Sequence, residues 1–348
     1  MYDVIILGSG PAGLTAAIYT QRFGLKTVVV AGRTWGGQLM LTTGVENFPG
    51  FTHIQGPELM KKMRDQVAGL GVEILDVDFT KLSIPNDKDS GNLGDSRNPK
   101  GPFVVTAEDK IVEGKTVIVA TGADTRWLGV PGEAKLRGHG VSSCAPCDAF
   151  FFKGKPVAVV GGGDSAMEEA QVIANVSPDV VLIHRRDEFR AQKASLDKVM
   201  AMKNVRFLYN TRVVDVLGDA SVTGLLLETE TIVHKQGVSS LDELIKQFGG
   251  TAKTGNQWEL PRQGVFVAVG LIPNTKQFGT LELDSHGYVK RYEERDENGV
   301  LNYVTKTNTP GVFTAGDVHD ARYKQAVTAA AFGCMAALDV QRWLSEMD

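Results

Sequence analysis

The sequence of 348 residues predicts an α/β fold with two parallel-sheet domains, a number that its length also suggests. Continuous apolar runs recur along the chain, and such runs are typical of strands buried on both faces of a parallel sheet. Two of these runs lead directly into a glycine-rich turn followed by a helical stretch. The 39 glycines show no collagen-like period, so they indicate many tight turns between strands and helices.

Composition argues against several classes of protein. The net charge of −4 provides no basic field for nucleic acid or an anionic membrane surface, so we expect neither as a partner. Three cysteines are too few for a secreted disulfide framework. The strand-like run Tyr2–Leu7 leaves no room for a leader, and no apolar run reaches the ~20 residues of a membrane span. We therefore expect a cytoplasmic protein.

The first glycine-rich turn has the full context of a dinucleotide-binding fingerprint. A buried strand over 3–7 precedes it, a helix over 14–23 follows, and a second strand covers 27–30. The acidic residue expected after that second strand is replaced by Ala31-Gly32-Arg33, so ribose contacts must come from other groups. The helix N-terminus is expected to face the pyrophosphate. The turn itself comprises Gly8, Ser9, Gly10, Pro11, Ala12 and Gly13.

A second turn of the same kind follows the strand at 156–160 and has the permitted G-x-G-x-x-A form. The end of the next strand, at 180–184, carries no carboxylate to bind a free 2′-OH, and three arginines follow within six residues: Arg185, Arg186 and Arg190. Guanidinium groups pair with phosphate in bidentate fashion, so this site is expected to select NADPH over NADH. The alternative is a solvated basic turn.

Between the two turns lies Cys144-Ala-Pro-Cys147, followed directly by Asp148. This spacing fits a redox dithiol, a metal site or a structural disulfide. A metal would need at least two more ligands, and the only other cysteine is Cys334, so no metal is predicted. Ser142 and Ser143 could cap a helix whose dipole lowers a thiol pKa. Asp148 could exchange a proton with a thiol, which favours the redox interpretation.

Two nucleotide sites with a dithiol between them predict a flavin, because a flavin accepts hydride and then reduces sulfur. Asp317 could bind ribityl hydroxyls, and the helix that begins near Gln325 and Ala326 could direct N–H donors at the flavin ring. A loop rich in glycine, amides and hydroxyls could line the edge of the ring, although an ordinary turn is an equal alternative. Its candidate residues are Gly37, Gln38, Leu39, Thr42 and Asn47.

The order of motifs resembles the low-molecular-weight thioredoxin reductases over nearly the whole chain. The motifs are GSGPAG, GGQL, ENFPG, ATG, CAPCD, GGGDSA, HRRDEFRA, PGVFTAGD and KQAVTAA. The resemblance implies two Rossmann-like dinucleotide-binding domains, with an NADPH domain inserted into an FAD domain. The expected bounds are 1–122 and 264–348 for the FAD domain and 123–263 for the NADPH domain.

The resemblance also assigns roles. It implies a homodimer that reduces thioredoxin, with domain rotation between the half-reactions. Cys147 would face the flavin, Cys144 would attack the thioredoxin disulfide, and Asp148 would be the acid–base group. The family motifs add Thr121, Gly122 and Gly316 as FAD contacts, together with Lys324, which stands where the family usually has arginine. In the second site they add Gly161, Gly163, Asp164, Ser165 and His184 as NADPH contacts.

Two segments depart from the family pattern. Residues 229–262 are longer than usual and contain a capping box at Ser240–Glu243, which predicts a short amphipathic helix. Residues 290–306 are highly charged and predict an exposed hairpin. Two other functions stay open: a flavin-dependent thiol oxidase of the same fold, which needs no NADPH site, and a non-catalytic nucleotide-binding redox sensor.

Overall fold

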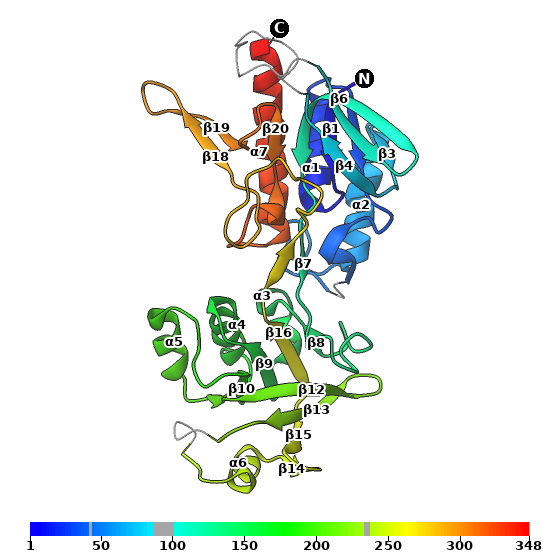
Figure 1. Cartoon of the computed structure of the whole chain (residues 1–348). Coiled ribbons are helices and arrows are strands. Elements are labelled where there is room, and N and C mark those ends of the chain that lie inside the picture. The colour runs from blue at the N-terminus through cyan, green and yellow to red at the C-terminus, as the bar shows by residue number, and fades with distance from the viewer. Residues whose placement is uncertain (42–43, 86–100, 233–236, 348) are drawn as a thin grey trace. The chain divides into compact units, whose positions relative to one another are not determined.

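The computed structural model describes residues 1–41, 44–85, 101–232 and 237–347. The chain divides into two compact units. Unit 1 comprises Met1–Asp124 and Ile272–Asp348, and unit 2 comprises Thr125–Leu271 (Figure 1). Both are α/β structures with parallel sheets, so the predicted fold class is confirmed. No helix in the described parts of the chain is long and apolar enough to cross a membrane.

Unit 1 is built on a nine-stranded sheet in the order β18-β19-β20-β6-β1-β2-β3, with β4 and β5 attached through β6. Its centre is parallel, since β1 pairs with β2 and β6, and β20 pairs with β6. Four consecutive residues of β1 are fully buried, as the apolar run predicts. The strands are β1 (Tyr2–Leu7), β2 (Thr27–Val30), β3 (Glu73–Leu75), β4 (Phe79–Ser83), β5 (Phe103–Ala107), β6 (Lys110–Val119), β18 (Tyr292–Arg295), β19 (Leu301–Lys306) and β20 (Val312–Thr314).

The helices of unit 1 are α1 (Pro11–Arg22), α2 (Gly56–Gly69) and α7 (Ala326–Met347), with short 3₁₀ turns η1 (Gly37–Leu41) and η5 (Gly316–Val318). Helices α1 and α7 pack directly on each other. A β-carbon at Gly333 would lie 2.1 Å from the carbonyl oxygen of Ala12, so only glycine allows this approach. The contact brings the C-terminal helix against the first glycine-rich turn.

Unit 2 has a five-stranded parallel sheet in the order β11-β10-β9-β16-β8 and a four-stranded antiparallel sheet in the order β12-β13-β15-β14. Its helices are α3 (Ala145–Asp148), α4 (Asp164–Ala174), α5 (Lys193–Met200) and α6 (Leu241–Phe248), with the 3₁₀ turn η3 (Ala149–Phe152). The strands are β8 (Val141–Ser142), β9 (Val157–Gly161), β10 (Val180–Ile183), β11 (Val205–Leu208), β12 (Thr211–Gly218), β13 (Val222–Thr229), β14 (Thr251–Ala252), β15 (Gln257–Pro261) and β16 (Gly264–Ala268).

Helix α6 confirms the helix predicted in the long segment 229–262. Ser240 Oγ accepts the Glu243 N–H at 3.2 Å, while the Glu243 carboxylate accepts the Ser239 N–H at 2.8 Å. The helix ends at Gly249, which has a left-handed φ of 69°. Its apolar side is buried, with Phe248 against Trp258 of β15. This segment therefore contributes to the core of unit 2; residues 233–236 lie outside the described residues.

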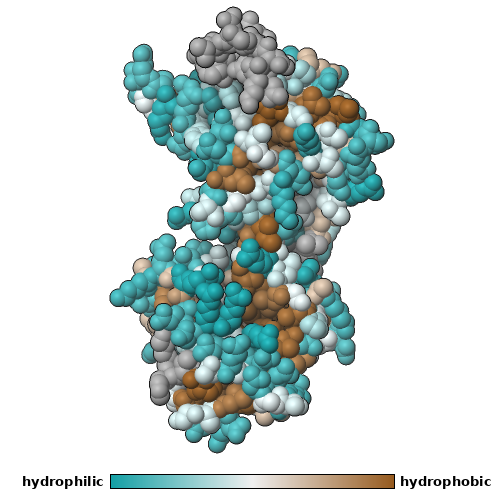
Figure 2. All heavy atoms as spheres, in the orientation of Figure 1, coloured by the Kyte–Doolittle hydropathy of each residue, from teal (hydrophilic) through white to brown (hydrophobic). Residues whose placement is uncertain are grey.

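The predicted hairpin at 290–306 is also confirmed. Strands β18 and β19 pair antiparallel at the edge of the unit 1 sheet. Every residue of β18 is exposed, and the hairpin carries the ion pair Lys306–Glu294. Its surface is hydrophilic in Figure 2. A charged edge of this kind opposes pairing with a further strand.

The chain crosses between the units twice, through β7 (Ala123–Thr125) and β17 (Leu271–Pro273), which pair with each other. The second expected boundary, at residue 264, is wrong. Strand β16 pairs in parallel with β9 in the centre of the unit 2 sheet, and the chain leaves unit 2 only after Leu271. The sequence of β16 is a buried apolar run that would suit either parallel sheet, so its pattern alone does not assign it.

Candidate redox and nucleotide sites

The two cysteines of the CxxC form a disulfide directly after β8, the edge strand of the parallel sheet of unit 2. Their Cα atoms are 5.3 Å apart, and both residues are partly exposed. Strand β8 pairs with β16, so the disulfide follows a strand that is hydrogen-bonded to the centre of the sheet. The exposure of the pair is suited to exchange with an outside thiol.

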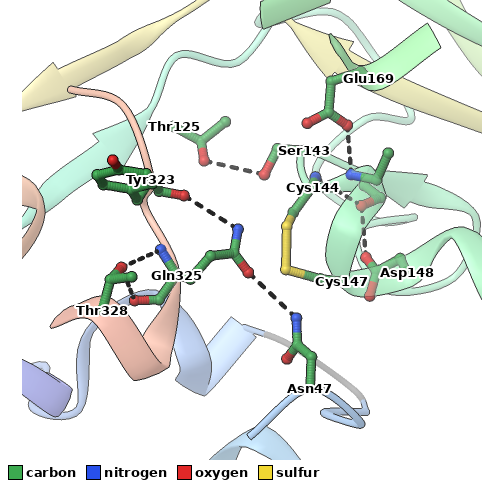
Figure 3. Close-up of a disulfide and its surroundings, with 12 residues drawn as sticks. Asn47, Thr125, Ser143, Cys144, Cys147, Asp148, Glu169, Tyr323, Gln325 and Thr328 are labelled. Atoms are coloured by element: carbon green, nitrogen blue, oxygen red, sulfur yellow. Dashed lines mark hydrogen bonds between the residues drawn. A yellow bond between two sulfur atoms is a disulfide. The ribbon is translucent and has the colours of Figure 1, made fainter. Parts of the chain in front are cut away.

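A network of hydrogen bonds surrounds the disulfide (Figure 3). The Ser142 hydroxyl donates to Asp148 Oδ2 at 2.5 Å and accepts the Cys144 N–H at 3.1 Å. The Glu169 carboxylate, from α4, accepts the Ala145 N–H. Ser143 instead contacts the Thr125 hydroxyl at 3.1 Å. The sequence contains no local signal for the Glu169 contact, because 24 residues separate its partners.

The expected capping of α3 by Ser142 or Ser143 is wrong. Cys144 itself is the N-cap residue, and no side chain caps the helix. The helix has only four residues and begins at Ala145, so both serines lie too far upstream to reach its free N–H groups. Ser142 serves Asp148 instead.

Asp148 is the acid–base candidate, and its surroundings favour the neutral form. Burial raises the pKa of the Asp148 carboxyl, while the hydrogen bond from Ser142 opposes that rise. Its Oδ1 is buried and has no hydrogen-bond partner among the described residues. A buried carboxyl with one free oxygen beside a disulfide is suited to donate a proton to a leaving sulfur.

In unit 1 the first fingerprint has the geometry of a nucleotide cradle. A β-carbon at Gly8 would lie 2.3 Å from the Ala120 carbonyl oxygen, and one at Gly13 would lie 2.0 Å from that of Gly8. These glycines allow close packing of the strand, turn and helix. A β-carbon at Gly10, the N-cap of α1, would meet nothing within 4 Å. The middle glycine therefore faces open space at a helix N-terminus, where a phosphate can bind.

Several other flavin candidates converge on this turn. Ser9 Oγ donates to the Ala31 carbonyl and accepts the Gly36 N–H, so it holds the adjoining loop. Gly37 and Gly316 approach Gly10 and Ala12, since their β-carbons would lie 3.5 Å and 2.8 Å from atoms of those residues. Pro11 occupies the first turn of α1. The turn, the 36–37 loop and η5 thus meet at one place.

The remaining unit 1 candidates are held by local contacts. Their partners are Asp124 for Gln38, Gln325 for Asn47, the Asn274 backbone for Thr121 and Gly122, and Asp320 for the N–H of Lys324. Figure 3 shows the Asn47–Gln325 contact, which lies just before the first residue of α7, Ala326. The Leu39 side chain packs against the core of unit 1. Thr42 lies outside the described residues.

Asp317 in η5 has a strongly raised pKa. Burial, reinforced by the charge of Asp320, raises the pKa of Asp317 to about 7. Its Oδ1 is buried without a partner among the described residues, and the same is true of His319 Nε2. Burial also lowers the pKa of His319 to about 4, so this ring is neutral. Sequence reasoning found Asp317 but missed His319, which no motif singles out.

The second fingerprint, in unit 2, repeats the first. A β-carbon at Gly161 would lie 2.4 Å from the Ala268 carbonyl oxygen, whereas one at Gly163, the N-cap of α4, would meet nothing within 4 Å. Asp164 Oδ1 accepts the Gln192 N–H at 2.8 Å and so ties the arginine loop to the turn. Ser165 lies in the first turn of α4 and is partly exposed. Both units therefore present an open helix N-terminus at the same position of the motif.

The loop after β10 presents its guanidinium groups to solvent. Arg185, Arg186 and Arg190 are exposed, and none forms an ion pair within the described ranges. His184 does not share this exposure, since the residue is only 6% exposed. Its ring stacks on Phe189 and contacts the Glu188 carbonyl at 3.0 Å. A β-carbon at Gly162 would lie within 2.1 Å of that ring. His184 thus packs inside the arginine loop and contacts its residues Glu188 and Phe189.

The two glycines of the second fingerprint are expected to respond differently to alanine. The Gly161→Ala variant should destabilise the protein by about 1–3 kcal/mol, because its β-carbon overlaps a backbone oxygen. Gly163→Ala should leave stability unchanged, since φ is −104° and the surrounding space is open. It should still weaken nucleotide binding by about tenfold, because backbone approach is lost. Thermal melts and nucleotide titrations of both variants check this; equal melting temperatures would contradict it.

Comparison with known proteins agrees with this geometry. The family model described as pyridine nucleotide-disulphide oxidoreductase matches residues 2–333. The chain belongs to this family. A thioredoxin reductase of Mycolicibacterium smegmatis is 43% identical, covering 100% of this chain and 98% of that protein. The solved thioredoxin reductase from Giardia duodenalis is 35% identical, with a TM-score of 0.80 and 99% of each chain covered. The chain is therefore an oxidoreductase and a homologue of the low-molecular-weight thioredoxin reductases.

Unit 2 of this pyridine nucleotide-disulphide oxidoreductase contains a disulfide and a glycine-rich turn of the dinucleotide-binding type. The disulfide follows β8, and the second fingerprint follows β9 in the same parallel sheet. The Cys144–Cys147 pair thus fits the redox-active dithiol of the family.

Proposed function

We propose that this protein is an NADPH-dependent, FAD-containing thioredoxin reductase, in which the Cys144/Cys147 dithiol carries electrons to a thioredoxin disulfide. One observation carries the proposal: a partly exposed CxxC disulfide lies beside a buried carboxyl, in the unit that also holds the arginine-flanked fingerprint. When bound, a flavin supplies the conversion of a two-electron hydride donor into a reductant of sulfur. The residues of the chain bind, orient and supply the proton.

Unit 1 fits FAD. Gly10 presents open space at the N-terminus of α1 that would hold the pyrophosphate, and the buried, unpartnered Oδ1 of Asp317 would accept a hydrogen bond from a ribityl hydroxyl. The start of α7, at Ala326, provides N–H groups suited to a polar ring edge, whereas the Gln325 N–H donates to Thr328 Oγ1 at 3.2 Å. We therefore assign unit 1 to FAD and unit 2 to NADPH.

The arginine loop supports NADPH over NADH, and a variant tests this. Replacing Arg185 and Arg186 together with glutamine is expected to raise the KM for NADPH by roughly 10- to 100-fold, because charge-assisted contacts to a phosphate are lost. The KM for NADH, which lacks that phosphate, should stay constant. Lys198→Gln, an exposed cation on α5 outside the loop, is the matched control. An equal change in both KM values would contradict the assignment.

The surface beside the disulfide supports a protein partner. Phe150 is 64% exposed and Phe151 is 37% exposed, directly after α3. Large aromatic side chains exposed next to a redox centre suit docking of another protein. A homodimer, a cytoplasmic setting and alternation of the two units by domain rotation are further parts of the proposal that follow from the family resemblance. A solved relative from Lactococcus lactis, 32% identical with a TM-score of 0.58, is described in an FR conformation, which supports rotation.

A single set of assays tests the function. The purified protein with its bound flavin should oxidise NADPH in the presence of oxidised thioredoxin, and should do so far more slowly without it. NADH should replace NADPH poorly. Turnover of dithiols with oxygen and without NADPH would instead support a thiol oxidase. Absence of bound flavin, or a preference for NADH, would overturn the proposal.

A further inference from the structure

We propose that Ser142 is a positioning residue for Asp148: its hydroxyl holds one carboxyl oxygen so that the other faces the dithiol for proton transfer. The inference rests on the proposed function, which it deepens. Ser142 is 6% exposed and lies on β8, paired with Phe266 of β16. Its position is therefore set by the sheet and is independent of the redox loop.

The direction of each hydrogen bond follows from the chemistry of the donors. The Cys144 N–H can only donate, so Ser142 Oγ accepts it at 3.1 Å. The serine proton is then free to point at Asp148 Oδ2, 2.5 Å away. Ser142 thus connects the backbone N–H of Cys144 to the carboxyl of Asp148. Asp148 Oδ1 is left buried with no partner within the described part of the chain, as required of an atom that exchanges a proton.

Among the described residues, no other charged group of the elements next to α3 holds the Asp148 carboxyl. Strand β8 and η3, on either side of α3, carry no titratable side chain. Helix α4 presents Glu169, which is engaged by the Ala145 N–H. Burial raises the pKa of Asp148, and the Ser142 hydrogen bond is the opposing influence. Removing the serine proton should therefore raise the pKa of Asp148 further.

The proton has a defined place in the exchange. The Cys144 thiolate attacks one sulfur of the partner disulfide, so a Cys144–sulfur bond forms and the partner S–S bond breaks. The leaving sulfur takes the electron pair and then the proton of the Asp148 carboxyl. Cys147 then gives its proton to the Asp148 carboxylate and attacks Cys144, which re-forms the disulfide. The bond between Cys144 and the second partner sulfur breaks, and that sulfur leaves with the electron pair. NADPH supplies the two electrons that reopen the disulfide for the next cycle.

The test compares pH profiles of thioredoxin reduction for the wild type, Ser142→Ala, Ser142→Thr and Ser143→Ala. In Ser142→Ala, kcat should fall by about tenfold and the alkaline limb should move up by about one pH unit, because the acid form of Asp148 persists. Ser142→Thr keeps the hydroxyl and should restore the profile. Ser143→Ala is the matched control, since Ser143 contacts Thr125 and not Asp148.

A double-mutant cycle excludes a merely structural effect. In an Asp148→Asn background, Ser142→Ala should cause no further loss, because its effect passes through Asp148. Independent, multiplying losses would overturn the inference, as would a Ser142→Ala profile that overlays the wild type. The pH dependence with which the dithiothreitol-reduced protein reacts with a small aromatic disulfide is measured in parallel. That reaction needs no thioredoxin. A wild type that is inactive with thioredoxin would therefore overturn the proposed function alone. An unshifted Ser142→Ala curve with the small disulfide would overturn this inference alone.

Discussion

The Cys147→Ser variant should lose thioredoxin reduction by on the order of a thousandfold or more, because an essential nucleophile is removed and no disulfide can re-form. Binding of flavin and nucleotide should be unaffected, since neither fingerprint contains this residue. Addition of NADPH should therefore still bleach the visible absorbance of the bound flavin. The paired measurement, rapid bleaching with no turnover, is the expected result.

The Cys144→Ser variant should lose turnover equally, yet the two variants should differ in their spectra. If Cys147 faces the flavin, the variant that retains its thiol should show long-wavelength absorbance at alkaline pH, from a thiolate beside the ring. The variant that retains Cys144 should not. Cys334→Ser is the control, because this free cysteine lies on α7 outside the motif. Appreciable turnover in either single variant would contradict the role of the dithiol.

The second large effect is expected at Asp317, where one substitution should improve stability and impair function. In the protein without flavin, the pKa of Asp317 is raised by burial from 3.8 to about 7. A group with a raised folded-state pKa contributes stability below its unfolded pKa and loses that contribution as pH rises through the folded value. Asp317→Asn should thus match the wild type near pH 4, gain between pH 4 and 7, and be more stable above pH 7 by on the order of a few kcal/mol.

The same variant should retain flavin poorly, because the amide cannot provide the carboxylate that we assign to the ribityl hydroxyls. Melting temperatures of the stripped protein against pH, and the flavin content of the purified variant, provide both readouts. Asp339→Asn is the contrasting control. Asp339 accepts the N–H groups of Val304 and Thr305 and the Thr305 hydroxyl, so its replacement should lower stability at neutral pH, where Asp317→Asn raises it. A uniform stability change across pH in Asp317→Asn would contradict the buried-charge explanation.

The sequence was sufficient where the chemistry is local. Both fingerprints, the CxxC and the capping box at Ser240 depend on residues a few positions apart, and each has the predicted local structure. Contacts between residues far apart in the sequence could not be predicted from it. Nothing near Ser142 indicates that its hydroxyl serves Asp148 and not a helix cap, and nothing near Glu169 indicates a contact to Ala145.

The expected boundary at residue 264 differs from the observed division after Leu271 for a related reason. A run such as 264–268 indicates a buried parallel strand, but the choice between two parallel sheets depends on long-range packing. A β-carbon at Gly264 would lie 2.2 Å from the Phe152 ring, so the residue that follows the CxxC region packs directly on β16. Such a fit between distant residues has no signature in a single sequence.

The paired crossing strands β7 and β17 have a consequence for how this architecture could arise and be re-engineered. Because β7 and β17 pair with each other, the two chain segments that connect unit 2 to unit 1 are adjacent. The Asn274 N–H donates to the Gly122 carbonyl at 3.0 Å just outside that connection, so the ends left by its removal are already neighbours. The coding sequence of unit 2 could therefore be inserted, exchanged or deleted at two positions of the gene, without changing the strand order of the unit 1 sheet.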